Sequence, residues 1–88
     1  MQEQRVGVVT HYWNNIHVAG VHLEDGTLEV GDKIHIVGHS TDLEQTVGSM
    51  QIEHHPIESA SAGRDVGLKV ADRVREHDVV YKVTEEPD

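Results

Sequence analysis

The strongest constraint on the fold is the kind of apolar residue the chain uses, which is mainly β-branched. Valine supplies 14 of the 88 residues and isoleucine five, whereas leucine and alanine supply four each. Side chains branched at Cβ are stiff and pack well on a pleated surface, so this inventory favours strands over helices. Eight glycines divide the chain into short runs, a pattern typical of a β-barrel or β-sandwich. A chain this short has room for one core, so we expect a single domain over residues 1–88.

Alternating apolar residues predict up to seven strands. These are expected at residues 5–10, 16–24, 27–30, 33–38, 46–54, 65–71 and 79–83. Within 46–54, Val47 and Met50 fall on opposite parity, which predicts a β-bulge near Gly48. In one small domain the strand edges are paired most simply by closure. We therefore expect an all-β fold, a single closed six- to seven-stranded Greek-key-type β-barrel with its core over about residues 5–83 and short flexible termini.

The same alternation predicts which side chains face the core. Ile34 and Ile36 are expected to point inward. In the last strand, Val79, Tyr81 and Val83 are expected to point inward together. In the first strand, the predicted arrangement has residues 6 and 8 on one face and residue 9 on the other.

Charge and cysteine content exclude several functions. Seven Lys and Arg against 16 Asp and Glu give a net charge of −9, and there is no cysteine. Nucleic-acid coating depends on many cations that displace counterions, so it is not expected. Disulfide scaffolds, thiolate metal sites and a cysteine nucleophile are excluded. No signal-peptide pattern or long apolar run is present, so we expect a cytoplasmic protein with no membrane contact.

Three stretches, in order, carry motifs of a known domain. Residues 23–38 hold Asp-Gly, Val-Gly-Asp and a strand ending in Ile-Val-Gly; residues 62–68 read Ala-Gly-Arg-Asp-Val-Gly-Leu; residues 74–80 read Val-Arg-Glu-His-Asp-Val-Val. Together they resemble the second domain of the translational GTPases, the β-barrel of elongation factor Tu and its relatives. The closing motif departs from the family, because Glu76-His77 stand where Arg-Gly is common. The chain is similar to the small stand-alone proteins called translation elongation factor-like.

The glycines of these motifs have structural roles. Gly26, Gly31 and Gly63 are expected at tight turns, and Gly67, inside a strand, at a close approach of two backbones. The phosphate-binding loop Gly-x-x-x-x-Gly-Lys-Ser/Thr is absent from the sequence, so no GTP binding is expected.

The resemblance also implies positions for a binding face. In elongation factor Tu the barrel helps to hold the aminoacylated end of tRNA through a Glu and an Asn, which by register fall on Gln51 and Asp65 here. Asp65 replaces an amide with a carboxylate that only accepts hydrogen bonds, which argues against inherited tRNA binding. Tyr12 and Trp13 are expected in a loop, where an aromatic pair can contact a base or an apolar partner. One of these rings can instead fill an end of the barrel.

The expected function is therefore non-catalytic binding without a cofactor. The resemblance implies docking to a protein or ribonucleoprotein surface of the translation apparatus, through Tyr12, Trp13, Gln51 and Asp65. An alternative is an accessory module for a U32-type peptidase-like enzyme, since similar barrels are fused to such peptidases. No serine lies in a nucleophile motif, so catalysis by the chain itself is not expected.

Metal binding by histidine is a second alternative. The chain has eight histidines, and the closest pairs in sequence are His17/His22, His35/His39 and His54/His55, the last with Glu53 beside it. A transition metal needs two to four ligands that converge on one point. His35 and His39 have the four-residue spacing of a helical metal motif, but residues 33–38 are expected to form a strand, so we expect surface histidines and assign no metal site.

Overall fold

The computed structural model describes residues 2–84, which form ten strands and no helix. The strands are β1 (Gln2–Trp13), β2 (Val18–Leu23), β3 (Thr27–Glu29), β4 (Lys33–Val37), β5 (Asp42–Thr46), β6 (Met50–Ile52), β7 (His55–Ile57), β8 (Ser59–Ser61), β9 (Asp65–Lys69) and β10 (Val79–Thr84). Within these residues no segment forms a helix long and apolar enough to cross a membrane.

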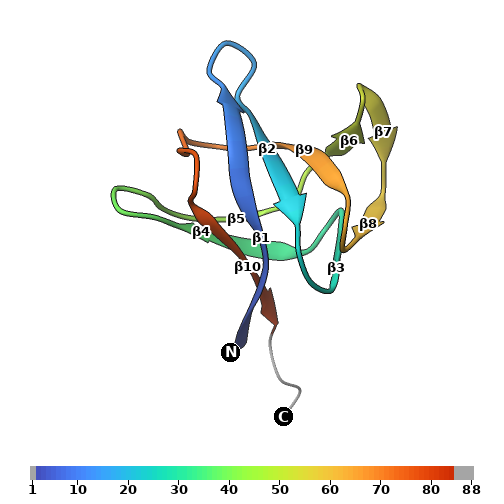
Figure 1. Ribbon diagram of the computed structural model, residues 1–88, viewed down its shortest axis with the longest axis horizontal. Helices are drawn as coiled ribbons and strands as arrows, with labels where there is room; N and C mark the ends of the chain where they lie inside the picture. The colour runs from blue at the N-terminus through green and yellow to red at the C-terminus, as the bar shows by residue number, and fades with distance from the viewer. Residues whose placement is uncertain (1, 85–88) are drawn as a thin grey trace.

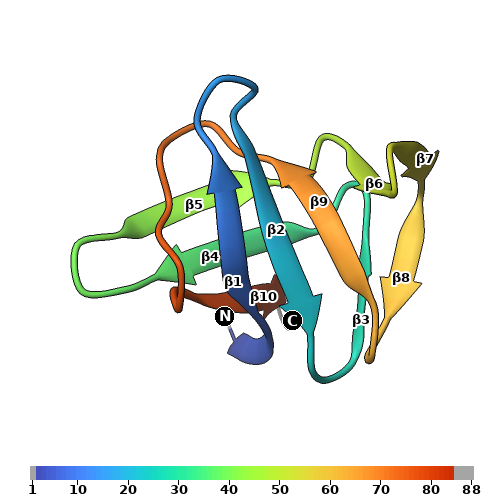
Figure 2. The same ribbon diagram turned by 45° about the horizontal axis from the view of Figure 1, so that its top comes forward.

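The strands form one coiled antiparallel sheet and a separate ribbon (Figure 1). The sheet has the order β5-β4-β10-β1-β2-β9-β6-β7, and β3 pairs with β8 in the ribbon. In Figure 2, β4 and β5 cross behind β1, β2 and β9, so the sheet curls over and one of its faces is enclosed between two layers. The side chain of Gln45 on β5 bridges these layers, because it accepts from the N–H of Ala71 at 2.7 Å and donates to the carbonyl of Lys69 at 2.9 Å. The predicted all-β, barrel-type fold is confirmed.

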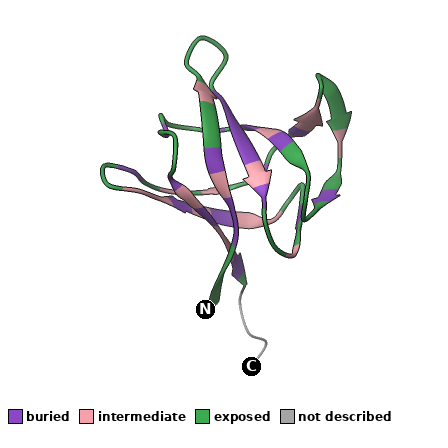
Figure 3. Cartoon of the chain, viewed as in Figure 1, coloured by how far each residue is buried: buried purple, intermediate pink, exposed green. Residues whose placement is uncertain are grey.

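The core lies between the two layers of the wrapped sheet, where Figure 3 shows the buried segments. Its largest fully buried side chains are Leu23, Leu28, Ile34, Ile36 and Leu68. Ile34 and Ile36 point inward as the alternation of residues 33–38 predicts. These side chains come from β2, β3, β4 and β9, so the core joins the sheet to the short ribbon.

The parity predicted for the first and last strands is wrong except at Val83, which is buried as expected. In β10, Val80 and Val83 are buried, while Val79 and Tyr81 are half-buried. The reason lies in β1, whose register opposite β10 shifts between residues 5 and 7 and whose register opposite β2 shifts between residues 9 and 11. A β-bulge adds a residue to one strand and redirects the side chains around it. As a result, residues 6 and 9 of β1 are both buried, although strict alternation places them on opposite faces.

Three short strands, β5, β7 and β8, were not expected, so there are ten strands rather than six or seven. The predicted strand over residues 46–54 is divided, because β5 ends at Thr46 and β6 begins at Met50. Val47, between them, is buried and its N–H donates to the carbonyl of Asp32 at 2.8 Å. Strands of three or five mostly polar residues have too little alternation to be seen in the sequence.

Positive φ angles mark the turns. Gly26, Gly31 and Gly63 have φ of 67°, 98° and 94°, the left-handed region that glycine tolerates best. Gly67 is inside β9 as expected, but the close approach there is made by side chains rather than by a second backbone, since an added Cβ would lie 3.1 Å from Cγ of Gln51 and 3.3 Å from Cγ1 of Val18. His77 has φ of 74°, which gives a physical reason why the corresponding position in similar barrels is commonly glycine.

Candidate binding groove

Three of the four residues expected to bind a partner line one groove. Trp13 comes from the end of β1, Gln51 from β6 and Asp65 from the start of β9. The groove has a volume of about 290 Å³. Its other lining residues are Thr10, Gly20, Val21, Glu53, His54, Val66 and Gly67. Segments far apart in the sequence thus meet at one surface, because β1, β2, β9 and β6 are neighbours in the sheet.

Trp13 forms one wall of the groove and is held by its neighbours. Its ring packs over Gly20 on β2, where an added Cβ would lie only 3.1 Å from the indole. The ring of His11 stands edge-on to it, with 4.5 Å between ring centroids. The Trp13 residue nevertheless remains 43% exposed. A tryptophan fixed in place with a free face is the kind of residue that dominates binding energy in protein interfaces.

Gln51 reaches the groove because the residue opposite it has no side chain. Gln51 pairs with Gly67 across β6 and β9. The Gln51 side chain lies against the Gly67 backbone, with Cγ and Nε2 at 3.1 and 3.3 Å from the position of an added Cβ. Its amide both donates and accepts hydrogen bonds, so it can read a polar group on a partner. Gly67 therefore gives Gln51 its place in the groove wall.

Two acidic groups give the groove its charge. Asp65 Oδ1 lies 2.7 Å from Nδ1 of His22, its cross-strand partner on β2. Glu53 and His54 form the two-residue turn between β6 and β7, with φ of 50° and 66°. Positive φ at both central residues is the geometry of a type I′ hairpin turn. The tight turn thus places a carboxylate and an imidazole beside the indole of Trp13.

The chemistry of the groove fits a peptide better than a phosphate. An indole face takes an apolar or aromatic side chain, and the Gln51 amide pairs with a peptide group. The carboxylates of Glu53 and Asp65 repel phosphate and attract donors such as amines and N–H groups.

Tyr12 does not belong to the groove. Neighbouring residues of a strand point to opposite faces, and both Tyr12 and Trp13 lie in β1 rather than in the expected loop. Tyr12 is half-buried and packs against the core, and its hydroxyl lies 3.4 Å from Nδ1 of His17. It lines a different depression, together with Asn14 and the 73–76 segment. The alternative role noted for one ring, packing at the barrel rather than at a partner, fits Tyr12.

Sequence reasoning did not place Glu53 and His54 at the groove, nor His22 beside it. His22 does not line the groove, and it faces the groove residue Asp65 only because β2 and β9 pair, although these strands are more than 40 residues apart. Glu53 and His54 were weighed only as possible metal ligands, and they are at the groove because the chain turns there. A two-residue gap between strands is the usual signal of a hairpin, but Glu-His lacks the Asn or Gly that marks one.

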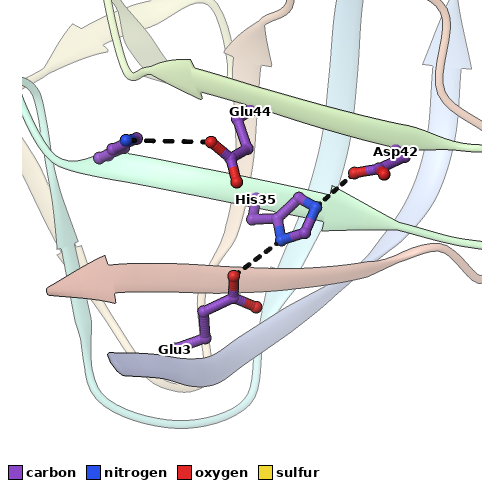
Figure 4. Close-up of polar contacts among 5 residues, drawn as sticks. Glu3, His35, Asp42 and Glu44 are labelled. Atoms are coloured by element: carbon purple, nitrogen blue, oxygen red, sulfur yellow. Dashed lines mark hydrogen bonds and ion pairs between the residues drawn. The ribbon is translucent and has the colours of Figure 1, made fainter. Parts of the chain in front are cut away.

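A second polar cluster lies outside the groove, around His35 on β4 (Figure 4). Nδ1 of His35 is 2.9 Å from Oε2 of Glu3 on β1, and Nε2 is 2.5 Å from Oδ1 of Asp42 on β5. The hydrogen bond to Asp42, followed by that to Glu3, raises the pKa of His35 above 6.5, and partial burial opposes this only in part. His35 is thus not the freely exposed histidine that the sequence predicts, since its side chain is only 17% exposed.

The raised pKa of His35 predicts a pH-dependent stability. The folded state binds the His35 proton more tightly than the unfolded chain does. The contribution of this protonation to the free energy of unfolding is therefore complete below the unfolded pKa of about 6.5. It is lost as the pH rises above 6.5 and through the folded-state pKa. We expect the free energy of unfolding, measured by urea titration, to fall between pH 6 and pH 9, and to fall less in His35→Gln. The exposed His39→Gln is the control; if it flattens the profile equally, the assignment to His35 is wrong.

The chain has a curled antiparallel sheet, a short two-stranded ribbon beside it and a groove on its side. Together these features define a β-barrel of the domain II type. The chain belongs to the elongation factor Tu domain 2 family, whose model matches residues 17–79. The predicted resemblance to the β-barrel of translational GTPases is therefore confirmed.

Individual relatives point to a second context. The chain is 40% identical over 81 residues to an uncharacterized protease of Methanocaldococcus jannaschii and 32% identical over 82 residues to a collagenase of Porphyromonas gingivalis. These matches cover 91% and 92% of this chain but only 20% and 23% of those proteins. The chain thus spans about a fifth of the length of these curated relatives.

Solved structures show the same fold. The C-terminal domain of a Geobacillus thermoleovorans protein described as a U32 peptidase superposes with a TM-score of 0.84 at 18% identity, covering 92% of this chain and 93% of that one. GDP-bound aIF5B from Aeropyrum pernix superposes with a TM-score of 0.62 at 15% identity, covering 91% of this chain and 14% of that one. At these identities the likeness concerns the fold alone.

Proposed function

We propose that this β-barrel is a non-catalytic accessory module that packs against the catalytic part of a U32-type peptidase-like protein, in the same chain or in a partner, through the groove around Trp13. The observation that carries the proposal is the 40% identity, over 91% of this chain, to one fifth of a protease. About four fifths of the protease lies outside this match, and we expect its active site there.

The composition of the groove supports a binding role. None of the lining residues is a serine or cysteine, and the Thr10 hydroxyl donates to the carbonyl of Gly20 at 3.3 Å. The carboxylate of Asp65 and the imidazole of His22 pair with each other on the surface, and among residues 2–84 neither group hydrogen-bonds to a hydroxyl. A fixed, exposed tryptophan beside an amide and two carboxylates suits recognition of a protein surface. The lack of cysteine fits the reducing cytoplasm.

The test is a binding titration. The chain is mixed with the catalytic part of a U32-type peptidase from the same organism, and the dissociation constant is measured by calorimetry. Loss of a central tryptophan typically costs about 2 kcal/mol or more, so Trp13→Ala should weaken binding more than tenfold. The control is Ile16→Ala, since Ile16 is equally exposed on the adjacent turn but is not among the groove residues. Unchanged affinity of Trp13→Ala, or no binding by the wild type, would refute the proposal.

A second candidate is docking to the translation apparatus. It is favoured by the family match over residues 17–79 and by the fold shared with aIF5B. Co-sedimentation with ribosomes, or capture of tRNA at moderate salt, should then be lost in Trp13→Ala. Co-purification with a peptidase that survives nuclease treatment, without ribosomes, favours the accessory-module proposal instead.

A further inference from the structure

Three strands bring metal-ligating atoms together at the His35 cluster, which is separate from the groove. Glu3 on β1, His35 on β4 and Glu44 on β5 each offer one ligand atom, and these three atoms all lie within 4.8 Å of one another. His35 and Glu44 are direct cross-strand partners, and β10 lies between β4 and β1. Figure 4 shows the Glu3 and Glu44 carboxylates on either side of the imidazole edge.

Asp42 fixes the orientation of the imidazole. The Asp42 carboxylate accepts a hydrogen bond from the Nε2–H group of His35. This orientation of the ring turns Nδ1 toward Glu3, at 2.9 Å. Metal-bound histidines usually donate their other ring N–H to a carboxylate in this way. At 2.9 Å the contact between Nδ1 and Glu3 is a hydrogen bond, which needs a proton on Nδ1. A metal cation bound by Nδ1 and Glu3 would replace that proton, and the two ligand atoms would move slightly apart.

We propose that Glu3, His35 and Glu44 bind a divalent transition-metal cation, with Zn²⁺ as the best fit, and that Asp42 positions His35 for it. One imidazole nitrogen and two carboxylates suit Zn²⁺, whereas Ca²⁺ and Mg²⁺ take oxygen ligands almost entirely. Tetrahedral Zn²⁺ places its ligands about 3.3 Å apart at bond lengths of about 2.0 to 2.1 Å. The present separations, from 2.9 Å to at most 4.8 Å, need only small side-chain rotations to reach this. Water completes the fourth position.

The ammonium group of Lys33 would compete with a metal ion for the carboxylate of Glu44. Nζ of Lys33 on β4 lies 3.9 Å from Oε2 of Glu44. Tyr81 on β10 is the cross-strand neighbour of His35 on its other side and adds no cation to the cluster. The three carboxylates around His35 therefore outweigh Lys33, and removal of Lys33 should favour the metal.

Calorimetric titration of the full chain with ZnCl₂ at pH 7.5, in a non-chelating buffer, tests the proposal. We expect one saturable site, weakened at least tenfold in His35→Gln and about 10- to 100-fold in Asp42→Asn, as is usual for a group that orients a ligand. Lys33→Gln should tighten binding. His39→Gln is the matched control and should bind like the wild type. Circular dichroism establishes that each variant is folded.

A second readout identifies the atom. Long-range ¹H–¹⁵N spectra should show that zinc shifts the Nδ1 resonance of His35 while Nε2 keeps its proton. Zinc affinity should fall at pH 5.5, because a proton competes for Nδ1. Zinc binding that is equally tight in His35→Gln would overturn the proposal. So would a wild type without saturable binding tighter than about millimolar; in that case the cluster holds a proton alone.

Discussion

Replacing Gly7 with alanine is expected to lower the free energy of unfolding by about 3 kcal/mol, at the upper end of the range for overpacking a tight site. Gly7 is buried in β1, and an added Cβ would lie 2.4 Å from the carbonyl oxygen of His22 and 3.1 Å from Cγ1 of Val21. The first contact is with backbone in the paired strand β2, so relief requires the two central strands to separate. Urea denaturation followed by circular dichroism measures the loss.

Gly48→Ala is the matched control for this prediction. A Cβ at Gly48 meets nothing within 4 Å, and its φ is not in the left-handed region. We expect its free energy of unfolding to stay within about 0.5 kcal/mol of the wild type. A Gly7→Ala variant as stable as Gly48→Ala would mean that β1 and β2 are not as close at this point as the structure shows.

Replacing Asp78 with alanine should cost about 2 kcal/mol, because it leaves a partly buried donor without its acceptor. Asp78 is only 4% exposed, and its Oδ2 accepts from the N–H of Arg75 at 2.8 Å. Its carbonyl accepts from Val9 on β1, so the carboxylate stabilises the loop where it joins the central sheet. For a domain of this size the cost corresponds to a fall of roughly 10 °C in melting temperature, measurable by calorimetry.

Two variants separate the role of this carboxylate from general effects in the loop. Asp78→Asn keeps an oxygen that can accept from Arg75, so its loss should be smaller than that of alanine. Asp72→Ala removes an exposed aspartate that accepts from its neighbour, the N–H of Arg73, at 2.7 Å, and should cost less than about 1 kcal/mol. Equal losses for Asp78→Ala and Asp72→Ala would refute the assigned role.

The candidate groove was predictable only in part. The match to known motifs pointed to Gln51 and Asp65, and the aromatic pair expected in a loop pointed to Trp13; the structure brings these three together. The sequence also paired Tyr12 with Trp13, but a strand places adjacent residues on opposite faces. That error followed from ending the first strand at residue 10, whereas β1 continues to residue 13.

The His35 cluster shows a second limit. Its members are at residues 3, 35, 42 and 44, whereas the metal-ligand pairs suggested by the sequence are histidines close together in the chain. His35 meets Glu3 because β10 pairs with both β1 and β4 and brings them onto the same layer. Such a ligand set has no fixed spacing along the chain, so no motif describes it.

The sequence by itself determined the fold class, since β-branched residues, alternation and glycines at turns are local signals that a strand or turn obeys wherever it lies. Only the tertiary structure decided which strands are neighbours and how the bulges of β1 shift their register. Those pairings and registers place Trp13 over Gly20, Gln51 over Gly67 and His35 among its carboxylates. The physical reason is that register depends on contacts across the whole core, which two-residue alternation within one strand does not specify.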